Sequence, residues 1–106
     1  MSYRTKEKKL LLDYLEKHPQ DELYSNLPSQ QVHHIFGKLT EELRTDELNL
    51  IALNSQTHYL AEFVSVQQIA NMIFDVQIAK YGQYFIDFAD KIGHKTWIKY
   101  KESYES

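Results

Sequence analysis

The apolar residues near the start of the chain recur with the period of a helix, and the pattern stops at a proline. Residues 5–17 place leucines and a tyrosine on one face, with lysines and acidic residues on the opposite face. The residue before a proline avoids the helical region, so His18 and Pro19 end this helix. Residues 19–30 contain both prolines of the chain, and they predict a connector with one helical turn at most.

A longer helical pattern fills the C-terminal part of the chain. Apolar residues recur at helical spacing through residues 66–80, after a predicted N-cap at Ser65, and the apolar stripe continues to Gly93, where a helix stop is expected. Residues 95–104 predict a last short helix in which Trp97 and two further apolar residues lie among lysines. Aromatic residues among lysines can stack on bases, but packing on the body of the domain or on a second subunit is the preferred interpretation.

The segment between these helical regions has the pattern of two strands followed by a helix. VHHIF, residues 32–36, is short and rich in β-branched and aromatic residues, and NLIAL, residues 49–53, is a compact apolar run. Both predict strands. Residues 37–48 are polar and charged and predict a wide loop over the hairpin. Asn54 is a good helix N-cap, and it opens a run that is compatible with a helix through Phe63.

Histidines on the predicted strand and helix are placed so that they can meet. Neighbouring residues of a strand point to opposite faces, so one of His33 and His34 faces the following helix. His58 and Glu62 lie four positions apart on one face of that helix. Imidazoles and a carboxylate are ligands of divalent transition metals, and a carboxylate also suits magnesium. The remaining strand histidine, with an ordinary pKa of about 6.5, suits a general base.

The spacing within this segment resembles that of an HNH nuclease, a member of the ββα-metal (His-Me finger) superfamily. Such proteins carry a histidine pair on the first strand, an asparagine after a long loop and a histidine on the helix. Here Asn49 follows His34 by 15 positions (49 − 34), and His58 follows it by 24 (58 − 34). The resemblance implies one divalent metal ion held by His33 and His58, with Glu62 as an optional further ligand. It also implies that His34 is the general base and that Asn49 fixes the loop and the orientation of that imidazole.

The chain departs from many HNH proteins because it contains no cysteine. Where the family often has CxxC pairs for a structural zinc ion, residues 53–58 read LNSQTH, so no structural zinc is expected and the fold depends on its own core. The resemblance implies Mg²⁺ or Mn²⁺ at the histidine site, with Ni²⁺ or Zn²⁺ as alternatives, and a small stand-alone protein of phage type. The lack of cysteine excludes a disulfide framework and fits a reducing, cytoplasmic compartment.

The charge balance limits how the chain can bind nucleic acid. With a net charge of −3 and an isoelectric point of 5.9, it is not expected to be a strong non-specific DNA binder. Local contacts are expected from Lys38 and Arg44 in the predicted loop. The same loop carries four acidic residues, which would repel a phosphate backbone unless they face away: Glu41, Glu42, Asp46 and Glu47.

These features predict a single α+β domain over residues 1–106 that is mostly helical. A two-stranded antiparallel hairpin and a helix (31–63) are packed by an N-terminal helix (5–17) and C-terminal helices (66–104). The expected function is metal-dependent hydrolysis of phosphodiester bonds in nucleic acid by an endonuclease, with DNA as the expected substrate. The alternative is a catalytically inactive protein of the same fold that binds nucleic acid or a protein, as an inhibitor or DNA mimic. No apolar run approaches a membrane span, so no membrane partner is expected, and a homo-oligomer remains open.

Overall fold

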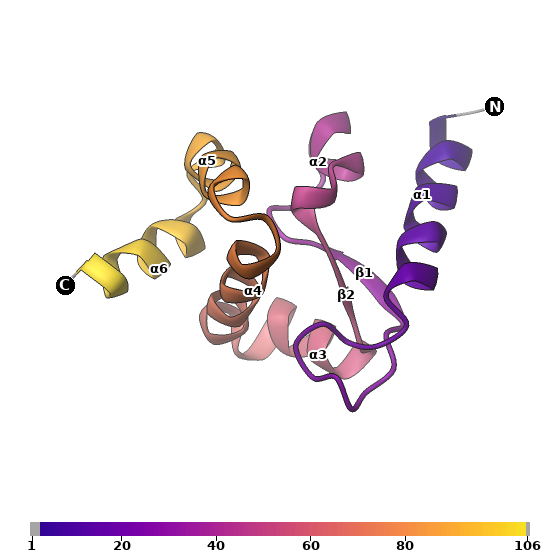
Figure 1. Ribbon diagram of the computed structural model, residues 1–106, viewed down its shortest axis with the longest axis horizontal. Coiled ribbons are helices and arrows are strands. Elements are labelled where there is room, and N and C mark those ends of the chain that lie inside the picture. Colours follow the sequence, from indigo (N-terminus) through magenta and orange to yellow (C-terminus); the bar gives the residue numbers. More distant parts are fainter. Residues whose placement is uncertain (1–2, 106) are drawn as a thin grey trace.

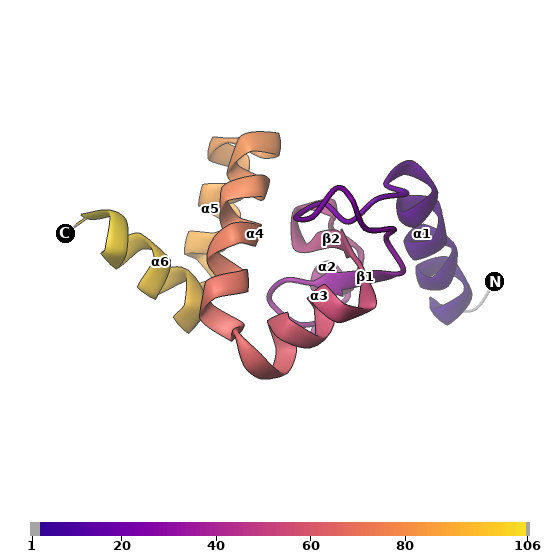
Figure 2. The same cartoon turned by 90° about the horizontal axis from the view of Figure 1, so that it is seen from below.

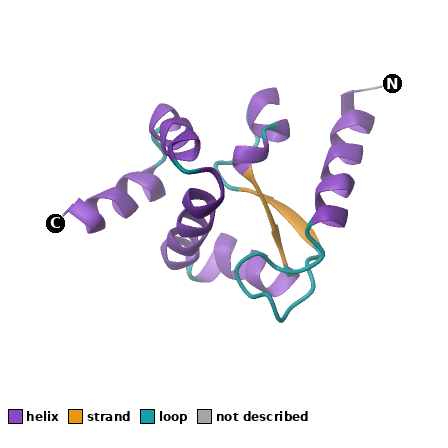
Figure 3. Cartoon of the chain, viewed as in Figure 1, coloured by secondary structure: helices purple, strands orange, loops and turns teal. Residues whose placement is uncertain are grey.

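A short antiparallel hairpin lies between one N-terminal helix and a group of C-terminal helices in the computed structural model (Figure 1). The structure describes residues 3–105. In chain order the elements are α1 (Tyr3–Lys17), β1 (Gln31–His34), α2 (Glu41–Thr45), the 3-10 turn η1 (Glu47–Asn49), β2 (Leu50–Leu53), α3 (Ser55–Tyr59), the π-helical turn η2 (Leu60–Val64), α4 (Val66–Tyr81), α5 (Gln83–Ile92) and α6 (Lys95–Glu105). Figure 3 shows that most of the chain is helical. The predicted α+β class, mostly helical with a two-stranded antiparallel sheet, is confirmed.

The first strand is shorter at its C-terminal end than the sequence pattern predicts. β1 and β2 pair in antiparallel register, with His33 opposite Ile51 and His34 opposite Leu50. The pattern predicts a strand that runs two residues further, but the chain turns there, and Gly37 N–H donates to His34 O. Gly37 has a φ of 83°, a conformation that glycine adopts without the strain that a side chain would cause.

The segment between the strands holds two short helical pieces, where the polar composition predicts only a wide loop. Thr40 caps α2 by accepting a hydrogen bond from Leu43 N, and Asp46 caps η1 by accepting one from Leu48 N. Side-chain oxygens at such positions satisfy backbone N–H groups that the start of a helix leaves unpaired. These two caps therefore order a segment that would otherwise be irregular.

The helix that follows β2 starts at its predicted cap and then changes its hydrogen-bonding pattern. Asn54 Oδ1 accepts a hydrogen bond from Gln56 N, as expected of an N-cap. After α3 the backbone bonds widen to the π type, and Ser65 N–H donates to Leu60 O across five residues. Ser65 then starts α4, as predicted, without a capping bond from its side chain. The turn η2 thus joins α3 to α4, and it carries Glu62.

Every residue of β2 is buried because helices cover the hairpin on both sides. Ile51 and Leu53 belong to an apolar cluster that Ile73 of α4 completes. Leu50 and Ala52 belong to a second cluster, which contains apolar side chains of α1. Figure 2 shows α1 and α4 on opposite sides of the strands. The hairpin is therefore held in place by packing from both directions.

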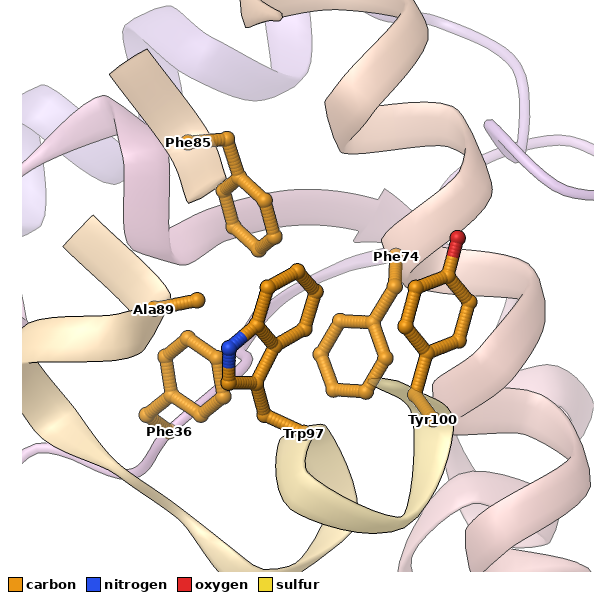
Figure 4. Packing of buried hydrophobic residues seen from close by; sticks show 6 residues of the cluster. All are labelled: Phe36, Phe74, Phe85, Ala89, Trp97 and Tyr100. Atoms are coloured by element: carbon orange, nitrogen blue, oxygen red, sulfur yellow. The ribbon is translucent and has the colours of Figure 1, made fainter. Parts of the chain in front are cut away.

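Aromatic side chains of α4, α5 and α6 form the larger core (Figure 4). Trp97 is 2% exposed and contacts Phe74 and Phe85, with ring centroids 5.2 and 5.7 Å away. Phe36, just beyond β1, stacks on Phe74 at 5.8 Å and connects this core to the hairpin. The preferred interpretation of the last helix, packing of its aromatic residues on the body of the domain, is confirmed for Trp97. The helix stop predicted at Gly93 is also confirmed, because this residue ends α5 in the left-handed conformation.

Side chains cover the outer edge of β2, where a larger sheet would place another strand. Glu22 N–H donates to Ala52 O, and the carboxylate of Glu22 accepts a hydrogen bond from Ala52 N at 2.7 Å. Leu50 O accepts hydrogen bonds from Tyr14 OH and from Gln77 Nε2. The polar groups of this edge are therefore satisfied by residues of α1, of the connector and of α4.

The molecule is elongated, with extents of 47 × 31 × 25 Å, because α1 and α6 lie at opposite ends of its longest axis. Among residues 3–105, no helix combines the length and the apolar character that crossing a membrane requires.

Candidate metal centre

Three side chains with metal-binding groups converge beside the hairpin. One ligand atom each of His33, His58 and Glu62 lies within 4.8 Å of the others. Glu62 Oε1 is 3.5 Å from His33 Nδ1 and 3.5 Å from His58 Nε2. Donor atoms of one metal ion lie about 3–3.5 Å apart when each is about 2.1 Å from the ion. The two distances to Glu62 Oε1 match this spacing, so two imidazole nitrogens and one carboxylate oxygen offer a donor set for a divalent ion.

Two local rules bring these groups together. Side chains alternate along β1, and His33 is the histidine that meets the following helix, where its ring lies edge-on to that of His58 with centroids 5.2 Å apart. His58 and Glu62 are four residues apart and lie on one side of their helix. Since α3 begins directly after Asn54, its first turn lies beside β1. The sequence pattern predicts this meeting of a strand histidine with a helix histidine.

The buried position of His33 determines its protonation state. Burial, and then the neighbouring imidazoles of His58 and His34, lower the pKa of His33 from its ordinary value near 6.5 to about 4. At neutral pH the ring is uncharged, so its contact with Glu62 is not an ion pair, although the distance would allow one. A neutral imidazole is the form that binds a metal ion.

His34 lies beside these groups but is held from a different direction. Its Nε2 is 3.1 Å from Arg44 O. Because a carbonyl oxygen can only accept a hydrogen bond, Nε2 carries the proton and Nδ1 keeps its lone pair. Burial is the main cause that lowers the pKa of His34, which favours the neutral ring. His34 therefore keeps an unprotonated ring nitrogen, and it lines the same cleft as His33 and Glu62.

Asn49 holds the segment between the strands from the inside. It is fully buried, and its Nδ2 donates to Gly37 O at 2.9 Å and to Leu43 O at 2.7 Å. Its Oδ1 accepts a hydrogen bond from Phe36 N at 2.8 Å. Leu43 directly precedes the residue whose carbonyl holds the His34 ring. Asn49 thus ties together the two ends of this segment, next to the carbonyl that contacts the His34 ring.

The two cations predicted to contact nucleic acid have different surroundings. The Arg44 guanidinium is engaged within the protein, since Nη1 donates to Lys38 O and Nε is 3.7 Å from a carboxylate oxygen of Glu7. Lys38 is exposed. Glu41 and Glu42 occupy the exposed first turn of α2. Of the two predicted contacts, Lys38 is the one that presents its side chain to solvent.

A cleft of about 330 Å³ opens beside the candidate ligands. His33, His34 and Glu62 line it from the hairpin and from η2, and residues 94–96, at the start of α6, line it from the C-terminal helices. A larger hollow of about 450 Å³ lies beside α1, but the histidine–glutamate group is elsewhere. Sequence analysis did not find residues 94–96 because only the packing of α4, α5 and α6 brings them to the histidines, and no spacing signal links the two segments.

His94 caps the N-terminus of α6, and its protonation should affect stability. Its Nδ1 accepts hydrogen bonds from Thr96 N at 3.2 Å and from Thr96 Oγ1 at 2.8 Å. Burial and the neighbouring Lys95 lower the pKa of His94 below its ordinary value near 6.5. A lowered pKa in the folded state means that this cap stabilises the protein fully above about pH 6.5 and is lost as the pH falls through the folded-state pKa.

The variant His94→Asn tests this cap, because asparagine is a good N-cap that does not titrate. Between pH 7.5 and pH 5, the wild-type chain should lose about 1 kcal/mol more free energy of unfolding than the variant does. Urea unfolding of both chains at the two pH values measures the difference. Equal losses in the two chains would contradict the cap.

Comparison of the chain with models of protein families, with curated proteins and with solved structures finds no match.

Proposed function

We propose that the chain is a metal-dependent endonuclease of the HNH type, in which residues 31–63 form a ββα-metal finger and DNA is the substrate. The observation that carries the proposal is the meeting of His33, His58 and Glu62 beside His34, whose Nδ1 keeps a lone pair. The order of strand, loop, strand and helix supports it, as do the hydrogen bonds of the buried asparagine.

The side chains have distinct roles in this proposal. His33, His58 and Glu62 hold one divalent ion. When bound, that ion supplies a Lewis acid that offsets the negative charge developing on the phosphate and on the leaving 3′ oxygen. His34 Nδ1 takes a proton from a water molecule, whose oxygen attacks phosphorus while the bond from phosphorus to the 3′ oxygen breaks. Arg44 O keeps its hydrogen bond to Nε2–H and stabilises the imidazolium that forms. The products are a 5′ phosphate and a 3′ hydroxyl, whose proton comes from solvent.

Nicking of supercoiled plasmid DNA tests the activity directly. The chain should nick the plasmid in Mn²⁺ or Mg²⁺, and EDTA should stop the reaction. The His58→Ala chain, purified in the same way, controls for a contaminating nuclease. Nicking that continues in EDTA, or an intact plasmid with every divalent ion tried, would contradict the proposal.

Metal binding has its own expected result. Calorimetry with Mn²⁺ or Ni²⁺ should show about one site per chain. The double variant with His33→Ala and His58→Ala should lose this site, since two of its three donors are gone. His18→Ala is the matched control, because His18 lies beside Glu22 rather than in this group. Binding that is unchanged in the double variant would reject these ligands.

A second candidate function is binding without cleavage by the same fold. The exposed Glu41 and Glu42, and the engagement of Arg44 by Glu7, favour it because both reduce the positive charge available to a phosphate backbone. Such a protein would act on a nucleic-acid-binding partner as an inhibitor or DNA mimic, or would bind nucleic acid and leave it intact. A chain that binds an oligonucleotide or a partner but never nicks a plasmid would support this candidate.

A further inference from the structure

The cleft beside the candidate ligands has walls of different chemical character. The hairpin and η2 contribute two imidazoles and the carboxylate of Glu62. The start of α6 contributes Lys95, which is the only lysine or arginine among the described residues that line the cleft. A substrate phosphate that binds near the metal-binding groups would therefore have one positively charged side chain, that of Lys95, on the wall of the cleft that α6 contributes.

The backbone around Lys95 is held firmly. Thr96 is buried, and its carbonyl accepts a hydrogen bond from Gln67 Nε2 of α4 at 2.9 Å. Trp97 is buried in the aromatic core. The Nδ1 atom of His94 is engaged in two hydrogen bonds with Thr96. Lys95 thus extends from a rigid helix start.

The ammonium group of Lys95 differs in its surroundings from those of Lys80 and Lys101. Lys80 is 2.7 Å from a carboxylate oxygen of Glu22, and Lys101 is 2.8 Å from one of Asp90. Lys95 is exposed and forms no ion pair with a residue in the described part of the chain. Its charge is therefore available to a ligand in the cleft.

We propose that this cleft receives one strand of the nucleic-acid backbone and that Lys95 binds a phosphate of that strand from the α6 side. The inference rests on the proposed function, and it adds a substrate contact that lies outside the finger. The cleft volume of about 330 Å³ is at the lower end for ligand sites. A cleft of this size is matched by a segment of the backbone of one strand, and the rest of a duplex would lie outside it.

Salt-dependent binding of a single-stranded oligonucleotide tests the contact. A fluorescently labelled oligonucleotide is titrated with the full chain in EDTA, so that no cleavage occurs, at several salt concentrations. Each phosphate neutralised on a single strand contributes about 0.7 to the slope of log K against log salt concentration. Lys95→Gln should therefore reduce the steepness of the slope by about 0.7 and weaken binding roughly five- to tenfold at low salt. Lys95→Arg should keep most of the wild-type slope.

Lys99→Gln is the matched control. Lys99 lies one turn further along α6, is exposed and does not line the cleft. This variant should bind with the wild-type slope. Equal losses in the two glutamine variants would mean that a general basic helix face binds the strand, and would overturn the proposal. An unchanged slope in Lys95→Gln would overturn it as well.

Plasmid nicking by the same proteins separates this inference from the proposed function. If the wild-type chain nicks DNA and Lys95→Gln keeps both its rate and its binding slope, the inference fails while the nuclease proposal stands. If the wild-type chain never nicks DNA, the nuclease proposal fails. The binding slopes still test the contact between Lys95 and a phosphate in that case. A reduced slope in Lys95→Gln but not in Lys99→Gln would support this contact. Unchanged melting temperatures of the variants exclude a loss of folding.

Discussion

The His34→Ala chain should nick DNA roughly 10²–10⁴-fold more slowly than the wild-type chain, while its affinity for Mn²⁺ stays nearly unchanged. This is the usual effect of losing a general base. The two properties are expected to separate because His34 is held by Arg44 O, whereas His33, His58 and Glu62 form the candidate ligand group. Nicking rates and calorimetry on the same preparations measure both quantities.

The comparison with other histidine variants makes this prediction specific. His58→Ala should lose both metal binding and nicking, because it removes a proposed ligand. If His34→Ala abolishes metal binding and His33→Ala does not, the roles of the two strand histidines are reversed. If neither His33→Ala nor His34→Ala changes the nicking rate, the activity comes from a contaminant.

The pH dependence of nicking follows from the environment of His34. Only the neutral imidazole can take a proton from water, and burial lowers the pKa of His34 below its ordinary value near 6.5. The rate should therefore be maintained at neutral pH and fall on acidification below about pH 6.5.

The largest expected effect on stability comes from Phe85→Ala, which should lower the free energy of unfolding by roughly 3–5 kcal/mol. Phe85 is fully buried and contacts Phe36, Phe74 and Trp97, with ring centroids 6.1, 6.2 and 5.7 Å away. Removing the ring leaves a cavity that these neighbours, which come from three different segments, cannot fill. Urea unfolding in EDTA measures the loss without a contribution from metal binding.

Two neighbouring aromatic residues serve as controls for the core prediction. Phe88→Ala should cost less than Phe85→Ala, because Phe88 is only partly buried. Tyr84 is 81% exposed, so Tyr84→Ala should change the free energy of unfolding by at most about 0.5 kcal/mol. If all three variants had the same small effect, or if EDTA alone unfolded the wild-type chain, the fold would not depend on this core.

The parts of the candidate site that sequence analysis predicts are those set by local geometry. Alternation along a strand determines that one histidine of the pair faces the helix, and a spacing of four determines that His58 and Glu62 share a side. Asn54 is recognisable as a cap because its side chain pairs with a backbone group two residues away. These relations need only a few neighbouring residues, so the sequence carries them.

The parts that sequence analysis does not predict depend on contacts between distant segments. Arg44 is expected to contact nucleic acid, yet its guanidinium faces Glu7 because α1 packs near α2. Lys95 reaches the cleft because three helices fold back on one another after Ser65. No local pattern of residues encodes such a meeting, since it depends on the packing of whole helices.

Tyr14, Glu22 and Gln77 occupy the outer edge of β2, so another chain finds the backbone groups of Leu50 and Ala52 already bonded there. Unpaired strand edges are where proteins add strands to one another and aggregate. The covering side chains therefore protect this edge against intermolecular strand addition at high protein concentration. A variant that loses the Glu22 carboxylate would leave Ala52 N–H without its partner at this edge, and its aggregation should then increase with protein concentration.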